Sequence, residues 1–165
     1  MLQPSDKGPE GYLKSGVEGV YQNKSLKIAA SIIRVADGGP ALIGELLDKK
    51  YVIIRLDIEN RSAAKVIYNP THTVLTNDAL DYRKPLDYTD LYDIKGEKGE
   101  AELSQLRGRF YDLTVTLLPG ERSSRLLIFE PMSKDVKKAE LTIKEIYVGT
   151  DTTRVAFPFE AKEGI

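Results

Sequence analysis

Short apolar runs in which every second side chain is polar recur through much of this sequence. The run over residues 51–59 is the clearest, because apolar side chains occupy every second position from Val52 to Ile58, with Arg55 and Asp57 between them. A two-residue period is typical of a strand that buries one face and exposes the other. The pattern therefore predicts a sheet with one face packed on a core.

Similar runs follow one another at short intervals, separated by Gly, Pro, Asn and Asp. The expected strands cover residues 26–35, 51–59, 66–68, 71–76, 82–88, 112–118, 124–130, 139–148 and 153–159. Strands with this spacing and no intervening helical repeat are typical of antiparallel sandwiches rather than βαβ folds. We therefore expect an all-β fold, an antiparallel β-sandwich of about seven to nine strands. Pro158 predicts that the last strand lies at an edge, because proline donates no ladder hydrogen bond.

Two segments have a helical rather than an alternating pattern, namely residues 40–47 and 100–106. They predict one or two short helical insertions between strands. A chain of 165 residues has the length of one domain. We expect a flexible N-terminal leader over residues 1–24, the β-sandwich over 25–160 and a C-terminal tail over 161–165, because the first residues are rich in Pro, Gly and charge.

The composition excludes several classes of site. There is no cysteine, which excludes disulfides, thiolate metal sites and a cysteine nucleophile. The single histidine, His72, excludes schemes that need two, and no Gly-x-Ser-x-Gly turn surrounds Ser123 or Ser124 as a partner for it. With 24 basic and 25 acidic residues, the net charge of −1 argues against binding of nucleic acid. These features favour a protein that is not an enzyme and has no cofactor.

Tyrosines and aspartates are concentrated in residues 77–93. Tyr82, Tyr88 and Tyr92 fit two interpretations: an aromatic interaction surface, since tyrosine is enriched at interfaces, or packing across strands. Together with Asp90, these tyrosines are our candidate binding residues.

The aspartates of the same segment have two interpretations as well. Asp78, Asp81, Asp87 and Asp90 are candidate calcium ligands, because Ca²⁺ binds clustered oxygen atoms. Their spacing does not match the EF-hand loop, and aspartate also favours turns and helix caps. We therefore favour a solvated loop with capping aspartates, and a metal site is the weaker hypothesis.

Several short motifs are similar to those of a known group of domains. They are E-N-R-S at residues 59–62, L-L-P-G-E at 117–121, L-L-I-F-E at 126–130 and A-E-L-T-I at 139–143. In this combination they resemble the immunoglobulin-like (telokin-like) domains of unknown function in bacterial extracytoplasmic proteins and lipoproteins. The resemblance implies an immunoglobulin-like sandwich in which these residues have structural roles.

The resemblance also implies a place and a function. Members of this group are mostly exported, which implies the periplasm or cell surface, another envelope protein as partner, and membrane contact only through a removed lipid anchor. No export signal follows Met1, so a cytoplasmic location stays open. We expect a non-enzymatic binding or accessory module of the bacterial cell envelope that acts through loops or an edge strand. The alternatives are a hydrolase or inhibitor on the same scaffold, and a calcium-stabilised structural domain. Residues 93–109 are an insertion relative to the group, where a specific function is expected to lie.

Overall fold

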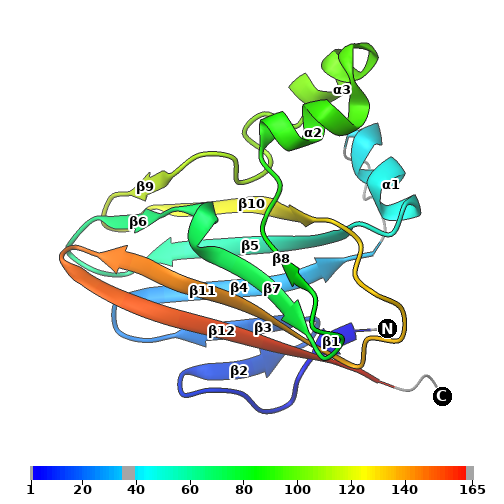
Figure 1. The fold of residues 1–165 in the computed structure, drawn as a ribbon. Coiled ribbons are helices and arrows are strands. Elements are labelled where there is room, and N and C mark those ends of the chain that lie inside the picture. The colour runs from blue at the N-terminus through cyan, green and yellow to red at the C-terminus, as the bar shows by residue number, and fades with distance from the viewer. Residues whose placement is uncertain (1, 35–39, 163–165) are drawn as a thin grey trace.

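The computed structural model describes residues 2–34 and 40–162, which form two antiparallel sheets and three short α-helices (Figure 1). The larger sheet of this described part contains β1 (Leu2–Pro4), β6 (Val66–Tyr68), β7 (Thr73–Asn77), β8 (Tyr82–Arg83), β9 (Val115–Leu117), β11 (Lys138–Val148) and β12 (Asp151–Ala161). The smaller sheet contains β2 (Tyr12–Ser15), β3 (Glu18–Gln22), β4 (Leu26–Ile33), β5 (Val52–Asn60) and β10 (Arg122–Phe129). The helices are α1 (Ala41–Asp48), α2 (Tyr88–Lys95) and α3 (Glu100–Ser104), with 3₁₀ turns η1 (Pro70–His72) and η2 (Glu97–Gly99).

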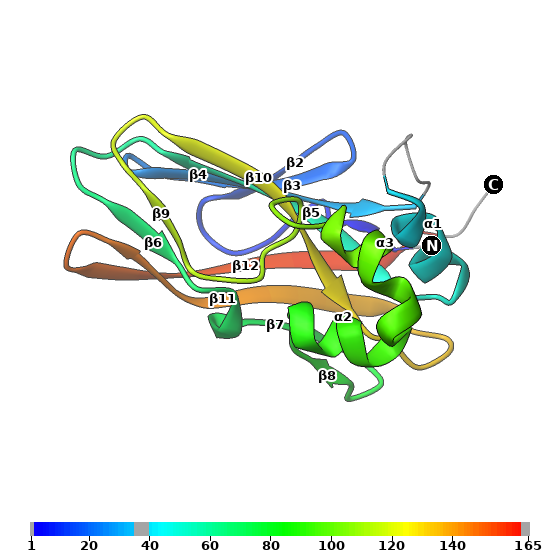
Figure 2. The ribbon, with the colours of Figure 1, turned by 90° about the horizontal axis from the view of Figure 1, so that it is seen from above.

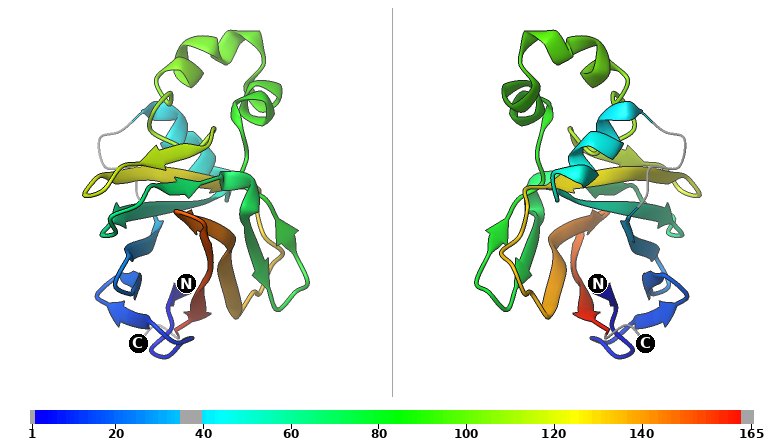
Figure 3. Two further views of the ribbon diagram at one scale, coloured as in Figure 1. Left: turned by 90° about the vertical axis from the view of Figure 1, so that its left-hand side faces the viewer. Right: turned by 90° about the vertical axis from the view of Figure 1, so that its right-hand side faces the viewer.

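The two sheets pack as layers of a β-sandwich, which Figures 2 and 3 show from above and from both ends. Ile54, Leu56 and Ile58 of β5 are fully buried between the layers, and Phe157 and Phe159 of β12 face them from the other sheet. Burying such a side chain stabilises the fold by about 1.5–3 kcal/mol. The alternation in residues 51–59 therefore predicted the buried face of β5 correctly.

Each expected strand is present at least in part, and the described residues contain twelve strands instead of seven to nine. The main reason is the N-terminal segment, where the expected flexible leader over residues 1–24 is wrong, because this segment forms β1, β2 and β3. Leu2, Tyr12 and Tyr21 pack against the main core, and the Tyr12 hydroxyl donates to the Ser5 carbonyl oxygen at 2.6 Å. The sandwich therefore begins at β1 rather than at residue 25. Of the expected C-terminal tail, Ala161 belongs to β12 and residues 163–165 lie outside the described residues.

Pro158 predicted an edge strand, but β12 lies one strand in from the edge, between β11 and the three-residue β1. β12 pairs with β11 along its length, whereas β1 pairs only with residues 159–161. Among the described strands, nothing else pairs with the β1 side of β12. The Ser5 N–H donates to the Pro158 carbonyl oxygen at 2.9 Å, so the backbone polar groups of Pro158 face the β1 side. Because proline cannot donate a hydrogen bond, this orientation leaves the ladder with β11 intact.

Asn60 and Gly120, two residues of the motifs, lie at the end of the sandwich opposite the helices, where they form a turn. Asn60 is fully buried, and its side-chain amide donates to the carbonyl oxygens of Ala64 at 2.8 Å and Leu117 at 2.9 Å. Gly120 has φ of 83°, which favours glycine, and its N–H donates to the Asn60 carbonyl oxygen. These residues link the two sheets and have the structural role that the motifs implied.

Both expected helical segments are helices, as α1 and α3, but α2 was not expected. The segment 82–88 was predicted as a strand, and only Tyr82 and Arg83 are extended as β8. Asp87 instead begins α2 with a capping box: its carboxylate accepts from the Asp90 N–H at 2.8 Å, and the Asp90 carboxylate accepts from the Asp87 N–H at 3.0 Å. Two satisfied N–H groups favour the helix over continuation of the strand.

Candidate binding surface

One end of the sandwich carries all three helices. We call α1 together with residues 86–110, which contain α2, η2 and α3, the helical end; it packs on part of the outer face of the smaller sheet, over β5 and β10 (Figures 1 and 3). A second hydrophobic cluster holds it there, made of Leu42, Ile43, Leu46, Ile53, Leu86, Leu91, Leu103, Leu106, Phe110 and Ile128. Since Ile53 and Ile128 belong to β5 and β10, the helices are packed directly on the sheet.

An ion pair network joins the three helices at their surface. The Lys95 ammonium lies 2.9 Å from the Glu45 carboxylate of α1 and 3.2 Å from the Glu102 carboxylate of α3. The hydrogen bond with Glu45 raises the pKa of Lys95, and the same bond lowers the pKa of Glu45. Surface pairs add little stability, so the second cluster holds the helices and the pairs fix their arrangement.

The candidate tyrosines occupy two different places. Tyr88 and Tyr92 lie on α2, half-buried against the second cluster, with Asp90 in the capping box between them. Tyr82 lies on β8 and is 50% exposed; the Lys144 ammonium donates to its hydroxyl at 2.7 Å, which lowers the pKa of Tyr82. The tyrosines therefore do not pack across strands as a group, and their role in binding stays a prediction.

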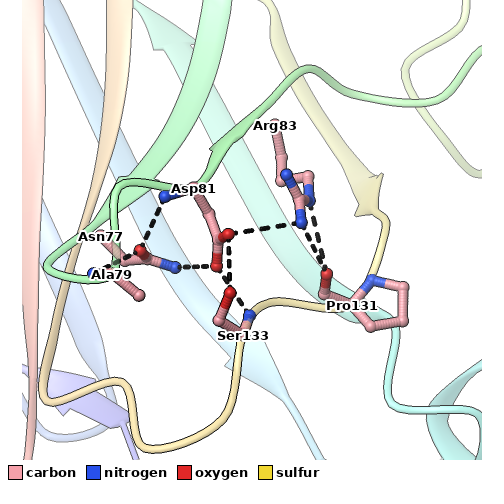
Figure 4. A network of polar contacts seen from close by, with 6 residues as sticks. All are labelled: Asn77, Ala79, Asp81, Arg83, Pro131 and Ser133. Carbon is pink, nitrogen blue, oxygen red and sulfur yellow. Dashed lines mark hydrogen bonds and ion pairs between the residues drawn. The ribbon is translucent and has the colours of Figure 1, made fainter.

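Asp81 is the centre of a polar network between the β7–β8 turn and the loop after β10 (Figure 4). Its carboxylate accepts from the Asn77 amide at 2.8 Å and from the N–H and hydroxyl of Ser133 at 2.7 and 2.8 Å. Arg83 lies 3.5 Å from the same carboxylate and donates to the Pro131 carbonyl oxygen. The bonds from Asn77 and Ser133 lower the pKa of Asp81 to about 2. The network fixes two loops to each other.

The other calcium candidates also accept hydrogen bonds from the protein. The Asp78 carboxylate accepts from the Lys137 N–H at 3.1 Å, and Asp87 and Asp90 cap α2. Over residues 2–34 and 40–162, no three acidic or histidine side chains are grouped closely enough to hold a metal ion. The interpretation of Asp87 as a helix cap is confirmed, and the structure does not bring the four aspartates together as ligands.

In the described residues, no hydrogen bond joins His72 to Ser123 or Ser124. His72 Nδ1 lies 3.9 Å from a Glu145 carboxylate oxygen. Ser123 instead shares a 2.8 Å hydrogen bond with the hydroxyl of Tyr111, which donates to the Leu56 carbonyl oxygen. Burial raises the pKa of Tyr111 to about 12. This buried hydroxyl therefore ties the segment after α3 to the smaller sheet.

A pocket of about 370 Å³ opens at the start of α2. It is lined by Tyr88, Arg107, Phe110, Asp112, Leu113 and Arg125. The Asp112 carboxylate accepts from the Tyr88 N–H at 2.9 Å, and Leu113 is 74% exposed. We call this site the α2 pocket; it brings an exposed apolar side chain next to charged and aromatic ones.

Both arginines of the α2 pocket lie on aromatic rings. The guanidinium carbon of Arg107 is 5.0 Å from the Tyr88 ring centroid, and that of Arg125 is 6.0 Å from the Tyr111 ring centroid. Within the part of the chain that the structure describes, neither guanidinium has an acidic partner within 4.0 Å. Sequence reasoning identified Tyr88 but missed Leu113 and both arginines, because no local pattern indicates that these distant residues meet.

A larger and more open depression lies on the outer face of the larger sheet. Its volume is about 710 Å³, and residues 5–7, 76–78, 138–140 and 158–160 line it. Asp6 within it lies 3.2 Å from the Lys162 ammonium and 3.4 Å from that of Lys14. Charges of both signs surround it, so its chemistry indicates no ligand class.

This chain is similar to two known protein structures at low sequence identity. Neither a family model nor a curated protein matches the sequence. A crystal structure of the yjhA protein from Bacillus subtilis is similar at a TM-score of 0.45 and 16% identity, covering 76% of each chain. The GAE domain of GGA2p from Saccharomyces cerevisiae is similar at a TM-score of 0.35 and 11% identity, covering 89% of this chain and 98% of that one. Both likenesses concern the fold alone. No helix in the described residues has the length and apolar character needed to cross a membrane.

Proposed function

We propose that this protein is a non-enzymatic binding module that captures a protein partner at its helical end. The observation that carries the proposal is the α2 pocket, where the exposed Leu113 lies beside Tyr88 and two arginines that have no acidic partner within 4.0 Å among the described residues. Aromatic and arginine side chains are enriched at protein interfaces and supply most of the binding energy there. An exposed leucine beside them provides apolar area that a partner would cover.

Backbone hydrogen bonds and buried side chains order the segment that supports this surface in the folded protein, which favours binding. The Tyr111 N–H donates to the Leu126 carbonyl oxygen at 2.8 Å, and the Leu126 N–H donates to that of Arg109 at 2.9 Å. Phe110 and Leu103 are buried in the second cluster. Because these contacts already order the backbone, a partner loses little free energy in ordering it.

The scaffold and its location are part of the same proposal. We take the sandwich to be immunoglobulin-like and its place to be the bacterial cell envelope, with another envelope protein as partner. The resemblance of residues 59–62 and 117–121 to extracytoplasmic domains supports this. Fractionation of the source cells tests the location, and recovery in the cytosol alone contradicts it.

The function is tested by capture from an envelope fraction, followed by calorimetry with the purified partner. Leu113→Ser removes the exposed apolar side chain of the pocket, and we expect binding to weaken by about tenfold or more. Leu118→Ser is the matched control, because Leu118 is 49% exposed but does not line the α2 pocket. Equal affinity of the two variants for the partner contradicts the proposal, provided that both keep the thermal midpoint of the unmodified protein.

A further inference from the structure

The chemistry of the α2 pocket is that of an anion site. Two guanidinium groups, from Arg107 and Arg125, line it, and neither has an acidic partner within 4.0 Å in the described residues. A guanidinium presents planar N–H donors that match the two oxygens of a carboxylate.

Both guanidinium groups are held in position before any ligand arrives. Arg107 lies on the ring of Tyr88, which is half-buried against the second cluster, and Arg125 lies on the ring of the buried Tyr111. A cation on an aromatic ring is attracted to its face. Because stacking restricts these long side chains, a ligand that binds them loses less free energy in ordering them.

The one carboxylate in the pocket does not neutralise the arginines. Asp112 accepts a hydrogen bond from the N–H of Tyr88 at 2.9 Å, and so anchors the start of α2. Two arginines against this single aspartate leave the lining net positive. Charge complementarity therefore favours an anionic ligand.

The remaining walls indicate that the anion belongs to a peptide. Leu113 is 74% exposed and lines the same pocket as Arg107 and Arg125. A free inorganic ion or a small carboxylate would leave this leucine in water, whereas a peptide with an apolar residue beside its acidic one would cover it. The volume of about 370 Å³ is at the small end of ligand pockets, in keeping with one or two side chains.

We propose that the α2 pocket binds an acidic peptide segment of the partner protein, whose carboxylate is held by Arg107 and Arg125 while a neighbouring apolar side chain covers Leu113. This rests on the proposed function, because it names the chemistry of the segment that the binding module recognises.

The test is fluorescence anisotropy of the full chain with short labelled peptides, capped at both ends. Each carries two glutamates and one leucine at varied spacing, and glutamine counterparts replace the glutamates. The acidic peptides are expected to bind, and Arg107→Gln and Arg125→Gln to weaken their binding by about tenfold each. Arg109→Gln and Arg122→Gln are matched controls, since both residues are exposed, carry the same charge and do not line the pocket. Raising sodium chloride from roughly 0.05 to 0.5 M is expected to weaken binding of the acidic peptides.

Each contrary result has its own meaning. Equal weakening by all four arginine variants shows unspecific charge attraction and overturns the inference. Equal binding of the glutamine peptides also overturns it, while leaving the binding function intact. Displacement of the peptide by glutarate at matching concentration identifies a small carboxylate as the ligand and rejects a peptide segment. If no peptide binds, the inference fails, and the Leu113→Ser comparison with the native partner decides the proposed function separately.

Discussion

The core between the sheets and the cluster beneath the helices take neighbouring residues from the same two strands. On β5, Ile54 lies in the main core and its neighbour Ile53 lies in the second cluster. On β10, Leu127 lies in the main core and Ile128 lies in the second cluster. Towards its other end β5 carries Arg55 on the face where Ile53 lies, because no helix covers that part. A strand covered on both faces therefore loses its two-residue period. The unbroken apolar stretch at the start of β5 marks where the helical end is packed.

The two regions also differ in how the chain builds them. The main core joins strands from both ends of the sequence, since β1 pairs with β12 and β4 with β5. The second cluster depends mainly on α1 and on residues 86–110, packed on one face of the smaller sheet. Regions held by few distant contacts open more readily than the main core of a domain. We expect the helical end to open locally while the sandwich stays folded.

The largest effect is expected from Phe157→Ala in the main core. Phe157 is fully buried between the sheets, so its truncation should lower the free energy of unfolding by about 3–5 kcal/mol. Urea unfolding followed by circular dichroism measures this. Both regions should lose structure in one transition, and survival of a folded sandwich at normal stability contradicts our assignment of the main core.

Leu103→Ala tests the comparison at the second cluster. Leu103 is fully buried in the second cluster, and we expect a loss of about 2–5 kcal/mol that is local to the helical end. Hydrogen exchange should show faster exchange in α2 and α3 and unchanged protection in β11 and β12. Equal loss of protection in the sheets would mean that the two regions unfold as one unit.

Asp87→Ala removes the cap of α2 and should cost about 1 kcal/mol. Its carboxylate accepts the Asp90 N–H, which water must satisfy in the variant. Thermal unfolding with hydrogen exchange should place the change in α2. Asp93→Ala is the control, because Asp93 is exposed beyond the first turn of the same helix. A control that destabilises α2 equally shows that the cap is not the cause.

The smallest effect concerns Asp81, which lies outside both clusters. Its pKa of about 2 is below the ordinary 3.8, so the folded state favours the ionised carboxylate. The stability from this group is therefore present above pH 3.8 and lost as the pH falls towards 2. Asp81→Asn should lower the thermal midpoint at neutral pH and change it less near pH 2. If the difference in thermal midpoint between Asp81→Asn and the unmodified protein does not depend on pH, this prediction is wrong. Hydrogen exchange of α2 should be the same in both proteins.

Particular residues show where prediction from sequence succeeded and failed. The buried face of β5 and the turn at Gly120 were predicted, because alternation and turn chemistry are local properties. α2 was missed because Tyr82 and Tyr88 favour strands, while the deciding bonds between Asp87 and Asp90 exist only once the helix has formed. β1, β2 and β3 were missed because the first residues are rich in Pro, Gly and charge, which indicated a flexible leader.

The sequence alone specified an antiparallel β-sandwich with short helices, since the period of two along a strand such as β5 already defines the face that must be buried. Tertiary structure decided the α2 pocket, because Arg107 and Arg125 meet only where the segment after α3 lies beside β10, with Phe110 and Leu126 as neighbours. Contacts between distant residues depend on how the layers pack, and no local pattern records them.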